Sequence, residues 1–477
     1  MAGQGLKQKT KKGLYWKFLD QFSNNGVQFI IGIIMARLLS PSDYGITALP
    51  AVFLAIAGIF VEAGFAQALI RKTEVTDSDL TTSFLYSTAV GALCYVLLFF
   101  ASPWIARFYD IPVLTPLIRV TALRFLYGSI GVPQQVILKR RLDFKTPAII
   151  SVIARILSGG FGIFLAYTGH GVWALVLASL FSDIVTITIT VCVVKWFPKA
   201  RWSKESFRYL WGFGNKMMAS GLLNTLYSNI TPIIVGKFYS TDALGVYNRA
   251  KGYAGLPALQ IYDILREVSF PVLSKIKDEP ERLISTYRTM IKVSAFVIFP
   301  IMMLFSALSE PLIIILLTEK WRASILLMQL ICFSLMWYPV HALNLNILMV
   351  GGRTDLFLRL EIIKKVVGLG VMACFLPFGL VAFCAAQIAS SIVMVFINTW
   401  YTGKLYNFGF RKQMRDIFPT LLLGLVMFGC VLLVTSLLSN MYLKLVLGGL
   451  LGIVIFGGGA LLFKFREIQE LKFLVKR

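Results

Sequence analysis

The sequence contains few of the residues that carry most enzyme chemistry. Only two histidines and six cysteines occur among its 477 residues, and no two cysteines have CxxC spacing. All six cysteines lie within long apolar stretches, where a thiol behaves as a small packing residue. We therefore expect no disulfide, no metal, no cofactor and no histidine-based catalytic triad.

Charged residues are also scarce. They make up 15% of the chain, against 57% hydrophobic residues and a mean hydropathy of +0.76. A soluble globular protein usually has a charged share of about a quarter. No Walker A sequence occurs, so the chain is not expected to hydrolyse ATP. The composition predicts an all-α integral membrane protein.

Apolar stretches long enough to cross a bilayer recur along the whole chain. A hydrocarbon core of about 30 Å needs about 20 apolar residues in a helix. The sequence predicts fourteen such spans. They cover residues 13–39, 45–70, 80–106, 117–138, 147–168, 171–196, 209–237, 241–270, 284–308, 323–350, 355–377, 378–404, 415–438 and 441–463.

The formal charge of +24 would suggest a nucleic-acid partner in a soluble chain, but its distribution indicates topology. Lysines and arginines crowd the termini and alternate loops, including 139–145, 195–208 and 411–415. The loops between them, such as 168–171, have no lysine or arginine. The positive-inside rule places both termini in the cytoplasm, which fits an even number of spans. The basic excess also attracts anionic lipid, and no nucleic acid is expected.

The chain contains an internal repeat. At an offset of 200 positions, Asn24, Ile33, Ile34, Ser40 and Gly45 meet identical residues, and Arg37 meets Lys237. From Pro103 onward the matches continue at an offset of 208 positions. The constant order of these matches favours a duplication. Two similar lobes are the architecture of many transporters.

The repeat predicts three parts. An N-lobe with six spans covers residues 1–200, a C-lobe with six spans covers 201–410, and a C-terminal hairpin of two spans with a basic tail covers 411–477. Because each lobe begins and ends on the same side, the lobes are related by an axis along the membrane normal. One chain with two lobes is sufficient as a monomer.

Polar residues form matching stripes on the first and seventh predicted spans. In each span they recur every three or four residues, so they share one helix face. The stripes are Lys17, Asp20, Asn24 and Gln28, and Lys216, Ser220, Asn224 and Ser228. Such a face looks into protein or water, and polar residues that hold helices together are the structural alternative.

Further ionisable residues lie within the predicted spans, where they are costly and usually functional or paired. Cations outnumber acids. We expect cations to line a cavity that binds an anionic substrate, and acids to couple transport to an ion. The cavity candidates are Lys17, Asn24, Arg37, Arg119, Arg124, Lys216, Asn224, Arg249 and Lys251, and the ion-coupling candidates are Asp20, Glu62 and Asp183. A structural pair between Arg155 and Asp183 remains an alternative for those two residues.

An Asp77-Ser78-Asp79 triplet precedes the third span. Such a DxD triplet can bind a metal-diphosphate sugar in glycosyltransferases. Thr76 and Asp79 also have the spacing of a capping box, which is the favoured interpretation. A membrane glycosyltransferase or polymerase would depend on these carboxylates.

Several motifs resemble one family. The stretch 35–45, with its Ala36-Arg37-Leu38-Leu39-Ser40-Pro41-Ser42-Asp43-Tyr44-Gly45 sequence, resembles the "ARxLxPxDYG" signature of polysaccharide transport proteins. These are the Wzx-type oligosaccharide flippases of the MOP exporter superfamily. Stretches 132–145, 171–175, 244–250, 270–274 and 320–321 resemble the same family. The likeness covers about residues 8–410 and is closest to the fourteen-span branch for colanic-acid-like and lipopolysaccharide pathways.

The resemblance implies a MOP-type fold with two pseudo-symmetric six-helix bundles and a cationic central cavity. It also implies transport of an undecaprenyl-diphosphate-linked oligosaccharide to the outer leaflet of the bacterial inner membrane, for exopolysaccharide, O-antigen or capsule synthesis. Polysaccharide polymerase and export machinery are the further implied partners. A cation-coupled multidrug exporter of the same fold is the alternative, but it would need a net acidic cavity. Among cavity residues, the resemblance itself supports only Arg37.

Overall fold

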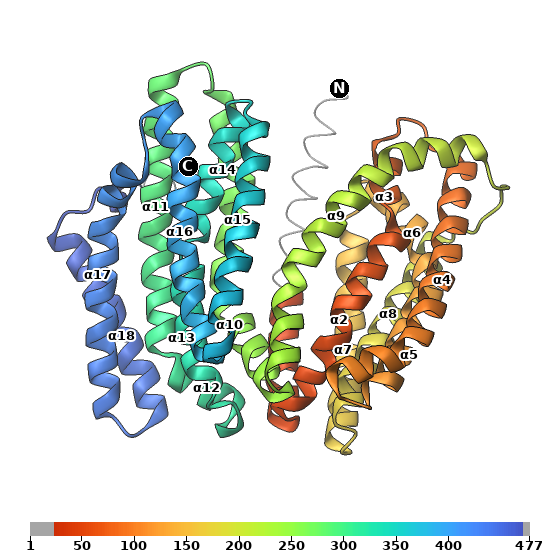
Figure 1. Cartoon of the computed structure of the whole chain (residues 1–477), viewed down its shortest axis with the longest axis horizontal. Helices are drawn as coiled ribbons and strands as arrows, with labels where there is room; N and C mark the ends of the chain where they lie inside the picture. The colour runs from red at the N-terminus through yellow and green to blue at the C-terminus, as the bar shows by residue number, and fades with distance from the viewer. Residues whose placement is uncertain (1–22, 471–477) are drawn as a thin grey trace. The chain divides into compact units, whose positions relative to one another are not determined.

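The computed structural model describes residues 23–470, except for the side chains of residues 264, 266 and 267. Lys17 and Asp20 lie outside the described residues. The described chain is helical throughout and has no strand. It divides into two compact units, residues 1–245 and 246–477 (Figure 1). This division cuts α10 and lies later than the predicted lobe boundary at residue 200, which stays a prediction.

The described part of the first unit begins with a helix over residues 23–38. It continues through α2 (Pro41–Glu62), α3 (Phe65–Arg71), α4 (Asp77–Tyr109), α5 (Leu114–Ala122), α6 (Arg124–Arg140), α7 (Lys145–Tyr167), α8 (Val172–Val194), α9 (Lys204–Phe238) and the start of α10 (Thr241–Lys275).

The second unit takes up the rest of α10. It then contains α11 (Pro280–Ala307), α12 (Ser309–Leu317), η1 (Glu319–Trp321), α13 (Ser324–Leu335), α14 (Tyr338–Val350), α15 (Thr354–Phe375), η2 (Leu376–Phe378), α16 (Leu380–Tyr406), α17 (Phe410–Leu437) and α18 (Met441–Leu462).

Nine helical segments of the described chain are long and apolar enough to cross a membrane. Each coincides with one of the fourteen predicted spans. The other five predicted spans also form helices, but they are interrupted, richer in polar residues or only partly described. These are 13–39, 117–138, 209–237, 241–270 and 355–377.

The order of helices repeats along the chain, as the matched sequences predict. The fourth span of the first half is broken into α5 and α6 at Leu123, and the tenth span is broken into α13 and α14 at Met336 and Trp337. The long helices α7 and α8 follow the first break, and α15 and α16 follow the second. The predicted two-bundle architecture therefore appears as the same succession of helices twice, followed by α17 and α18.

The signature stretch 35–45 contains a complete helix start. Ser40 accepts a hydrogen bond from the Asp43 amide through Oγ, and Asp43 Oδ2 accepts one from the Ser40 amide at 2.9 Å. Pro41 occupies the first helical position, where its missing N–H costs nothing. This capping box ends the preceding helix and starts α2 within a few residues.

The repeated glycines permit a contact between the starts of α2 and α10. A Cβ on Gly45 would lie 1.8 Å from the Thr241 carbonyl oxygen, and a Cβ on Gly245 would lie 1.9 Å from that of Pro41. Ser42 Oγ and Thr241 Oγ1 share a hydrogen bond of 2.8 Å. The two copies of the motif thus pack backbone against backbone, which explains why both end in glycine.

In the second unit, buried polar residues join four helices. Asn344 of α14 accepts a hydrogen bond from Tyr287 of α11 at 2.8 Å and exchanges hydrogen bonds with Gln413 of α17. Thr402 of α16 also donates to Asn344. His341, on the same polar helix, contacts Asn398 at 3.0 Å. Buried polar groups are stable when they are satisfied in this way.

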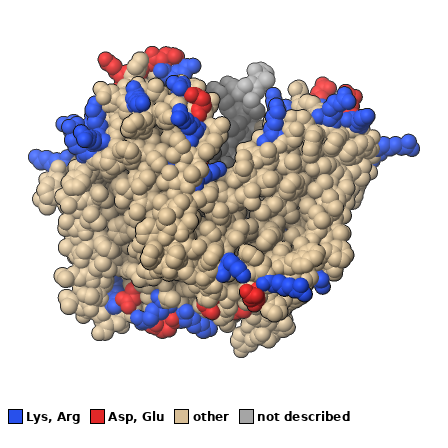
Figure 2. Space-filling model, in the orientation of Figure 1, with Lys and Arg blue, Asp and Glu red and all other residues tan. Residues whose placement is uncertain are grey.

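Two helices lie close to the predicted boundaries between the three parts of the chain. The helix α9 packs against α2, α3 and α4 of the first unit, although the repeat assigns it to the second half. The helix α17 packs along α11 and supplies Gln413 to the buried network, so it is an integral wall of the second unit (Figure 1). In Figure 2 most visible charges lie toward the top and the bottom of the view, with a largely uncharged band between them.

The backbone contact at Gly45 leads to a first prediction. Gly45→Ala should destabilise the protein by about 1–3 kcal/mol, because the new methyl group cannot fit against the Thr241 carbonyl. Gly58→Ala in the same helix is the control, since a Cβ there meets nothing within 4 Å. Thermal unfolding in detergent measures both variants. Equal melting temperatures for the two would contradict a close backbone contact at Gly45.

Candidate functional site

A cavity of about 700 Å³ lies within the first unit, between α2, α5, α6 and α8. Its volume is in the range of small-molecule sites. Most of its wall is apolar. Its polar lining consists of Tyr44, Thr47, Glu62, Thr121, Arg124 and Ser179.

Two predicted site residues form an ion pair beside this cavity, and of the two Arg124 lines it. Arg124 Nη2 of α6 lies 2.9 Å from Asp183 Oδ2 of α8, and their side chains are 41% and 29% exposed. The contact is an ion pair without hydrogen-bond geometry, because Asp183 Oδ2 has no hydrogen-bond partner among the described residues. An arginine held by one ion pair keeps further N–H donors for a ligand.

Glu62 reaches the same cavity because α2 ends there. Ala63 and Gly64 adopt left-handed conformations with φ of 42° and 67°, which stop the helix directly after Glu62. The turn packs tightly on α9, since a Cβ on Gly214 would lie 2.3 Å from the Ala63 carbonyl oxygen. The Glu62 side chain is exposed and lines the cavity.

The arginines at 119 and 155 have contacts within the unit. Arg119 donates from Nε to Ser102 Oγ at 3.1 Å and lies over the Phe99 ring at 4.2 Å. Arg155 donates to Gln28 Oε1 at 2.7 Å. The alternative pairing of Arg155 with Asp183 is therefore wrong. Arg155 has its partner, Gln28, on the first helix, and Asp183 has its partner, Arg124, on α6.

The two polar stripes have different surroundings. In the first helix, Asn24 donates to Ser151 of α7 at 2.7 Å and is buried, so this end of the stripe holds two helices together. In α9, Lys216, Ser220, Asn224 and Ser228 are all exposed along one face. The shared face predicted for α9 is present, and its polar groups are accessible to a ligand.

The repeat partners Arg37 and Lys237 are both exposed, but they differ in their contacts. Lys237 donates to the Phe108 carbonyl oxygen and lies 3.6 Å from Asp110 at the end of α4. A cation at a helix C-terminus is favourable, so these contacts give Lys237 a structural role. Arg37 lies in the last turn of the first helix.

The remaining cavity candidates belong to α10 in the second unit. The Arg249 guanidinium lies 5.7 Å from the ring centre of Trp321, which is fully buried. The Lys251 ammonium lies 5.9 Å from the ring centre of Tyr247, and its side chain is exposed. Both contacts are within the range of cation–π attraction.

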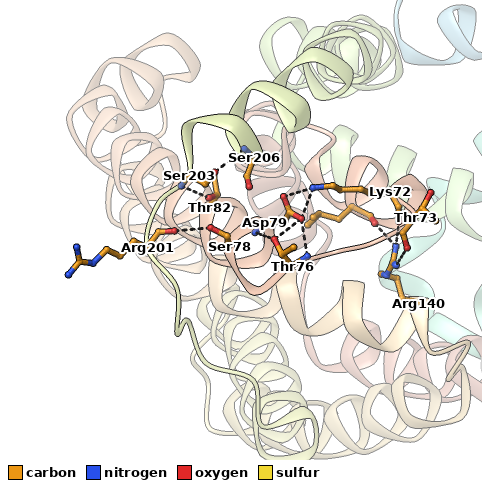
Figure 3. A network of polar contacts seen from close by, with 11 residues as sticks. Lys72, Thr73, Thr76, Ser78, Asp79, Thr82, Arg140, Arg201, Ser203 and Ser206 are labelled. Atoms are coloured by element: carbon orange, nitrogen blue, oxygen red, sulfur yellow. Dashed lines mark hydrogen bonds and ion pairs between the residues drawn. The ribbon is translucent and has the colours of Figure 1, made fainter.

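The acidic triplet before α4 forms a helix cap. Asp79 is fully buried and accepts hydrogen bonds from Lys72 Nζ at 2.7 and 2.8 Å and from the Thr76 amide at 3.0 Å (Figure 3). Thr76 and Asp79 complete the predicted capping box. Asp77 is exposed and accepts a hydrogen bond from Trp196. The carboxylate of Asp79 is thus bound by neighbouring groups of the protein itself, Lys72 and Thr76.

The same network anchors the segment that joins the two repeats. Ser78 donates to the Arg201 carbonyl oxygen at 3.2 Å, and the Ser203 amide donates to Thr82 at 3.1 Å (Figure 3). Arg140 of α6 donates to carbonyl oxygens at and beyond the end of α3, including that of Thr73 at 2.8 Å. These contacts fix the entry into α9 against α4.

The sequence matches one protein family over most of its length. A family described as "Polysaccharide biosynthesis protein" matches residues 34–326, more than half of the sequence. The match begins just before the repeated helix start and includes the cavity. The chain belongs to this family.

Relatives within the polysaccharide biosynthesis family match most of the chain. The teichuronic acid biosynthesis protein TuaB of Bacillus subtilis is 25% identical over 431 residues, with 89% of each chain covered. The lipopolysaccharide biosynthesis protein WzxC of Escherichia coli is 23% identical, with 82% of this chain and 81% of the relative covered. These matches confirm the predicted family.

Solved structures show the fold. The lipid II flippase MurJ in an inward closed conformation matches 94% of this chain and 99% of its own, with a TM-score of 0.74 at 15% identity. An inward-facing multidrug MATE transporter of the MOP superfamily matches 85% of this chain and 95% of its own, with a TM-score of 0.57 at 16% identity. The predicted MOP-type fold is confirmed.

Sequence patterns missed the hydroxyl groups of the cavity. Tyr44 lies inside the signature stretch 35–45 and Thr47 follows it, three residues later, and that spacing could have placed both on one face of α2. Thr121 and Ser179 come from other helices. No local signal connects them, because only the packing of α5 and α8 brings them together.

The capping role of Asp79 leads to a second prediction. Asp79→Asn should lower the free energy of unfolding by about 3 kcal/mol, because it leaves Lys72 without its buried partner. Asp77→Asn is the matched control and should retain normal abundance and transport. Quantitative immunoblotting of membranes and thermal unfolding measure abundance and stability. Loss of transport in Asp77→Asn at normal abundance would instead favour a carboxylate-dependent glycosyltransferase.

Proposed function

We propose that this protein moves a polyprenyl-diphosphate-linked oligosaccharide from the inner to the outer leaflet of the bacterial cytoplasmic membrane by alternating access. Membership of the polysaccharide biosynthesis family carries the proposal. A flippase needs a polar path for the sugar and diphosphate, while the lipid tail stays in the bilayer. The cavity of the first unit combines the groups that such a path requires.

The cavity has suitable chemistry for a phosphorylated sugar. Arg124 can replace its single contact to Asp183 with two parallel hydrogen bonds to a phosphate oxygen pair. Thr47, Thr121 and Ser179 offer hydroxyl groups that both donate and accept hydrogen bonds with sugar hydroxyls. We assign Arg124 to the diphosphate and these hydroxyl groups to the glycan.

The pairing of Arg124 with Asp183 also offers a means of coupling to an ion. Asp183 and a substrate phosphate compete for the same guanidinium, because both are anions of similar size. A proton or metal cation that neutralises Asp183 would release Arg124 to the substrate. Glu62, which lines the cavity from the end of α2, is the second acid that we assign to bind such a cation.

Further polar and cationic side chains outside the cavity are proposed as substrate contacts within each unit. Lys216 and Asn224 on α9, Arg37 at the end of the first helix, and Lys251 on α10 are accessible to an anionic ligand. Arg249 lies on the same helix as Lys251, beside the Trp321 ring. We retain these five as substrate contacts and assign Arg119 and Lys237 structural roles.

An efflux transporter for organic cations is the runner-up, supported by the likeness to a multidrug transporter in fold. A cation site would need unneutralised acid. The cavity contains Glu62, but Asp183 is already paired with Arg124. The family match favours the glycan pathway over this alternative. We expect no catalysis by the chain itself, and we infer that polymerase and export proteins act on the transported unit.

Arg124 provides the third prediction. Vesicles containing the purified wild-type chain should equilibrate a polyprenyl-diphosphate oligosaccharide between leaflets faster than protein-free vesicles. Arg124→Ala should weaken substrate binding about 10- to 100-fold, the loss expected for a charge-assisted contact. Leaflet-specific enzymatic labelling of the sugar measures transport, and lipid-linked sugar binding to purified protein measures affinity.

Two further variants make the Arg124 experiment specific. Arg124→Ala combined with Asp183→Asn removes both charges, so it tests ligand binding without leaving an unpaired acid in the span. Arg155→Ala is the matched control, because Arg155 contacts Gln28 and lies in α7 of the same unit. Wild-type transport by the double variant would remove Arg124 from the site. Equal transport by wild-type and protein-free vesicles would overturn the flippase itself.

Arg37 provides the fourth prediction. Arg37→Ala should abolish complementation of a flippase-deficient strain, and Arg37→Lys should retain only part of it, because lysine keeps the charge but loses the two-pronged hydrogen bonding. Lys237→Ala should be milder, since Lys237 contacts Phe108 and Asp110. Polymer yield at matched membrane abundance measures each variant. Full complementation by Arg37→Ala would leave that residue as a membrane anchor only.

A further inference from the structure

A second cavity, of about 570 Å³, lies in the second unit between α11, α17 and the turn that follows α18. It is separate from the cavity of the first unit. Its walls combine apolar side chains, including Leu422, Val426 and Phe463, with charged groups of both signs. The transport path proposed above uses none of these residues.

The cavity lies where two helices change from charged to apolar. In α17, Arg415 and Asp416 are followed by no charged residue until the end of the helix. In α18, the apolar span ends at Leu462, and Lys464 and Arg466 follow. The charged part of the cavity therefore lies at headgroup depth and the apolar part at acyl-chain depth.

The charged wall is arranged by fixed contacts. The Asp416 side chain is 5% exposed, and both of its carboxylate oxygens accept hydrogen bonds from Arg288. Lys292 Nζ lies 3.6 Å from Asp416 Oδ1. The Asp416 charge is thus fully compensated. Phe465 packs on Phe296 of α11 with ring centres 5.8 Å apart, which holds the turn after α18 against the cavity.

Two charges of opposite sign remain available to a ligand. Arg415 is exposed, and among the described residues it has no hydrogen-bond or ion-pair partner. Glu467 is only 8% exposed, lines the cavity and has no ion pair within the described chain. A carboxylate held in that position without a cation is unfavourable, so it indicates a cationic ligand group.

A second acid strengthens this indication. Glu470 lies one helical turn after Glu467, and among the described residues its Oε2 is buried without a hydrogen-bond partner. Burial raises the pKa of Glu470, and the nearby Glu467 charge raises it further. Lys292 and Arg466 oppose that effect. A ligand cation at Glu467 would relieve the repulsion between the two acids.

We propose that this cavity binds one phospholipid with an ethanolamine headgroup. Its phosphate contacts Arg415, with Arg466 and Lys292 beside it, and its ammonium donates to Glu467. One acyl chain follows Leu422 and Val426 along α17. A lipid with a net negative headgroup would meet Glu467 with no compensating cation. A choline headgroup has the charge but no N–H donor for the carboxylate.

Native mass spectrometry of the purified full chain tests this assignment. The protein is mixed with phosphatidylethanolamine, phosphatidylglycerol or phosphatidylcholine of identical acyl chains. We expect ethanolamine lipid to be retained about tenfold more than either of the others, because only it completes both charged contacts. Equal or stronger retention of phosphatidylglycerol or phosphatidylcholine by the wild-type protein would overturn the proposal.

The variants assign each headgroup contact. Glu467→Gln should remove the preference for ethanolamine over glycerol lipid, and Arg415→Ala should reduce retention of every phospholipid. Lys464→Gln is the matched control, because Lys464 lies on the same turn and does not line the cavity. Unchanged lipid retention in both Glu467→Gln and Arg415→Ala would place the lipid elsewhere. Since the readout is binding, its outcome is independent of the transport function proposed above.

Discussion

The cost of placing charge in hydrocarbon constrains the interior of this protein. An ionised side chain within a span costs several kcal/mol unless it is paired, hydrated or close to the interface. Arg124 pairs with Asp183, Arg155 with Gln28, and Arg119 with Ser102. Each contact joins two helices, so the need to satisfy charge also fixes how the helices of the first unit pack. Arg124 of this pair also lines the cavity of the first unit.

The repeated motif, residues 40–45 and 240–245, contributes both to starting a helix and to packing between helices. Its serine starts a helix by capping, and its glycine allows the backbone of the other copy to approach. Neither residue has an apolar side chain that would pack in a core. Where helix surfaces are mostly apolar, capping and close backbone contact are specific and hydrophobic packing is not.

The protein carries an unusual set of cationic side chains on a widely shared fold. The fold alone is shared by a lipid II flippase and a multidrug transporter, so it does not select a substrate. The family match selects the polysaccharide pathway, and the cationic side chains suit a diphosphate. In the second cavity, charged side chains are likewise proposed to select a ligand, here a lipid of the surrounding bilayer. The opposite charges of Arg415 and Glu467 would distinguish headgroups by charge and by hydrogen bonding.

The sequence by itself determined the membrane class, the repeat, the family resemblance and most helices. Composition and long apolar runs suffice for this, because bilayer thickness imposes one length on every span. The spacing of Thr76 and Asp79 was also enough to predict a cap, since capping depends on neighbours in sequence.

Only the tertiary structure decided which charges meet and which helices share a unit. Asp183 pairs with Arg124 and not with Arg155, and α9 packs with the first unit although its sequence begins the second half. Both outcomes depend on the rotation of each helix about its axis. In apolar spans, hydrophobic periodicity does not specify that rotation, because lipid and protein surroundings are equally apolar. Long-range backbone contacts and buried ion pairs specify it instead.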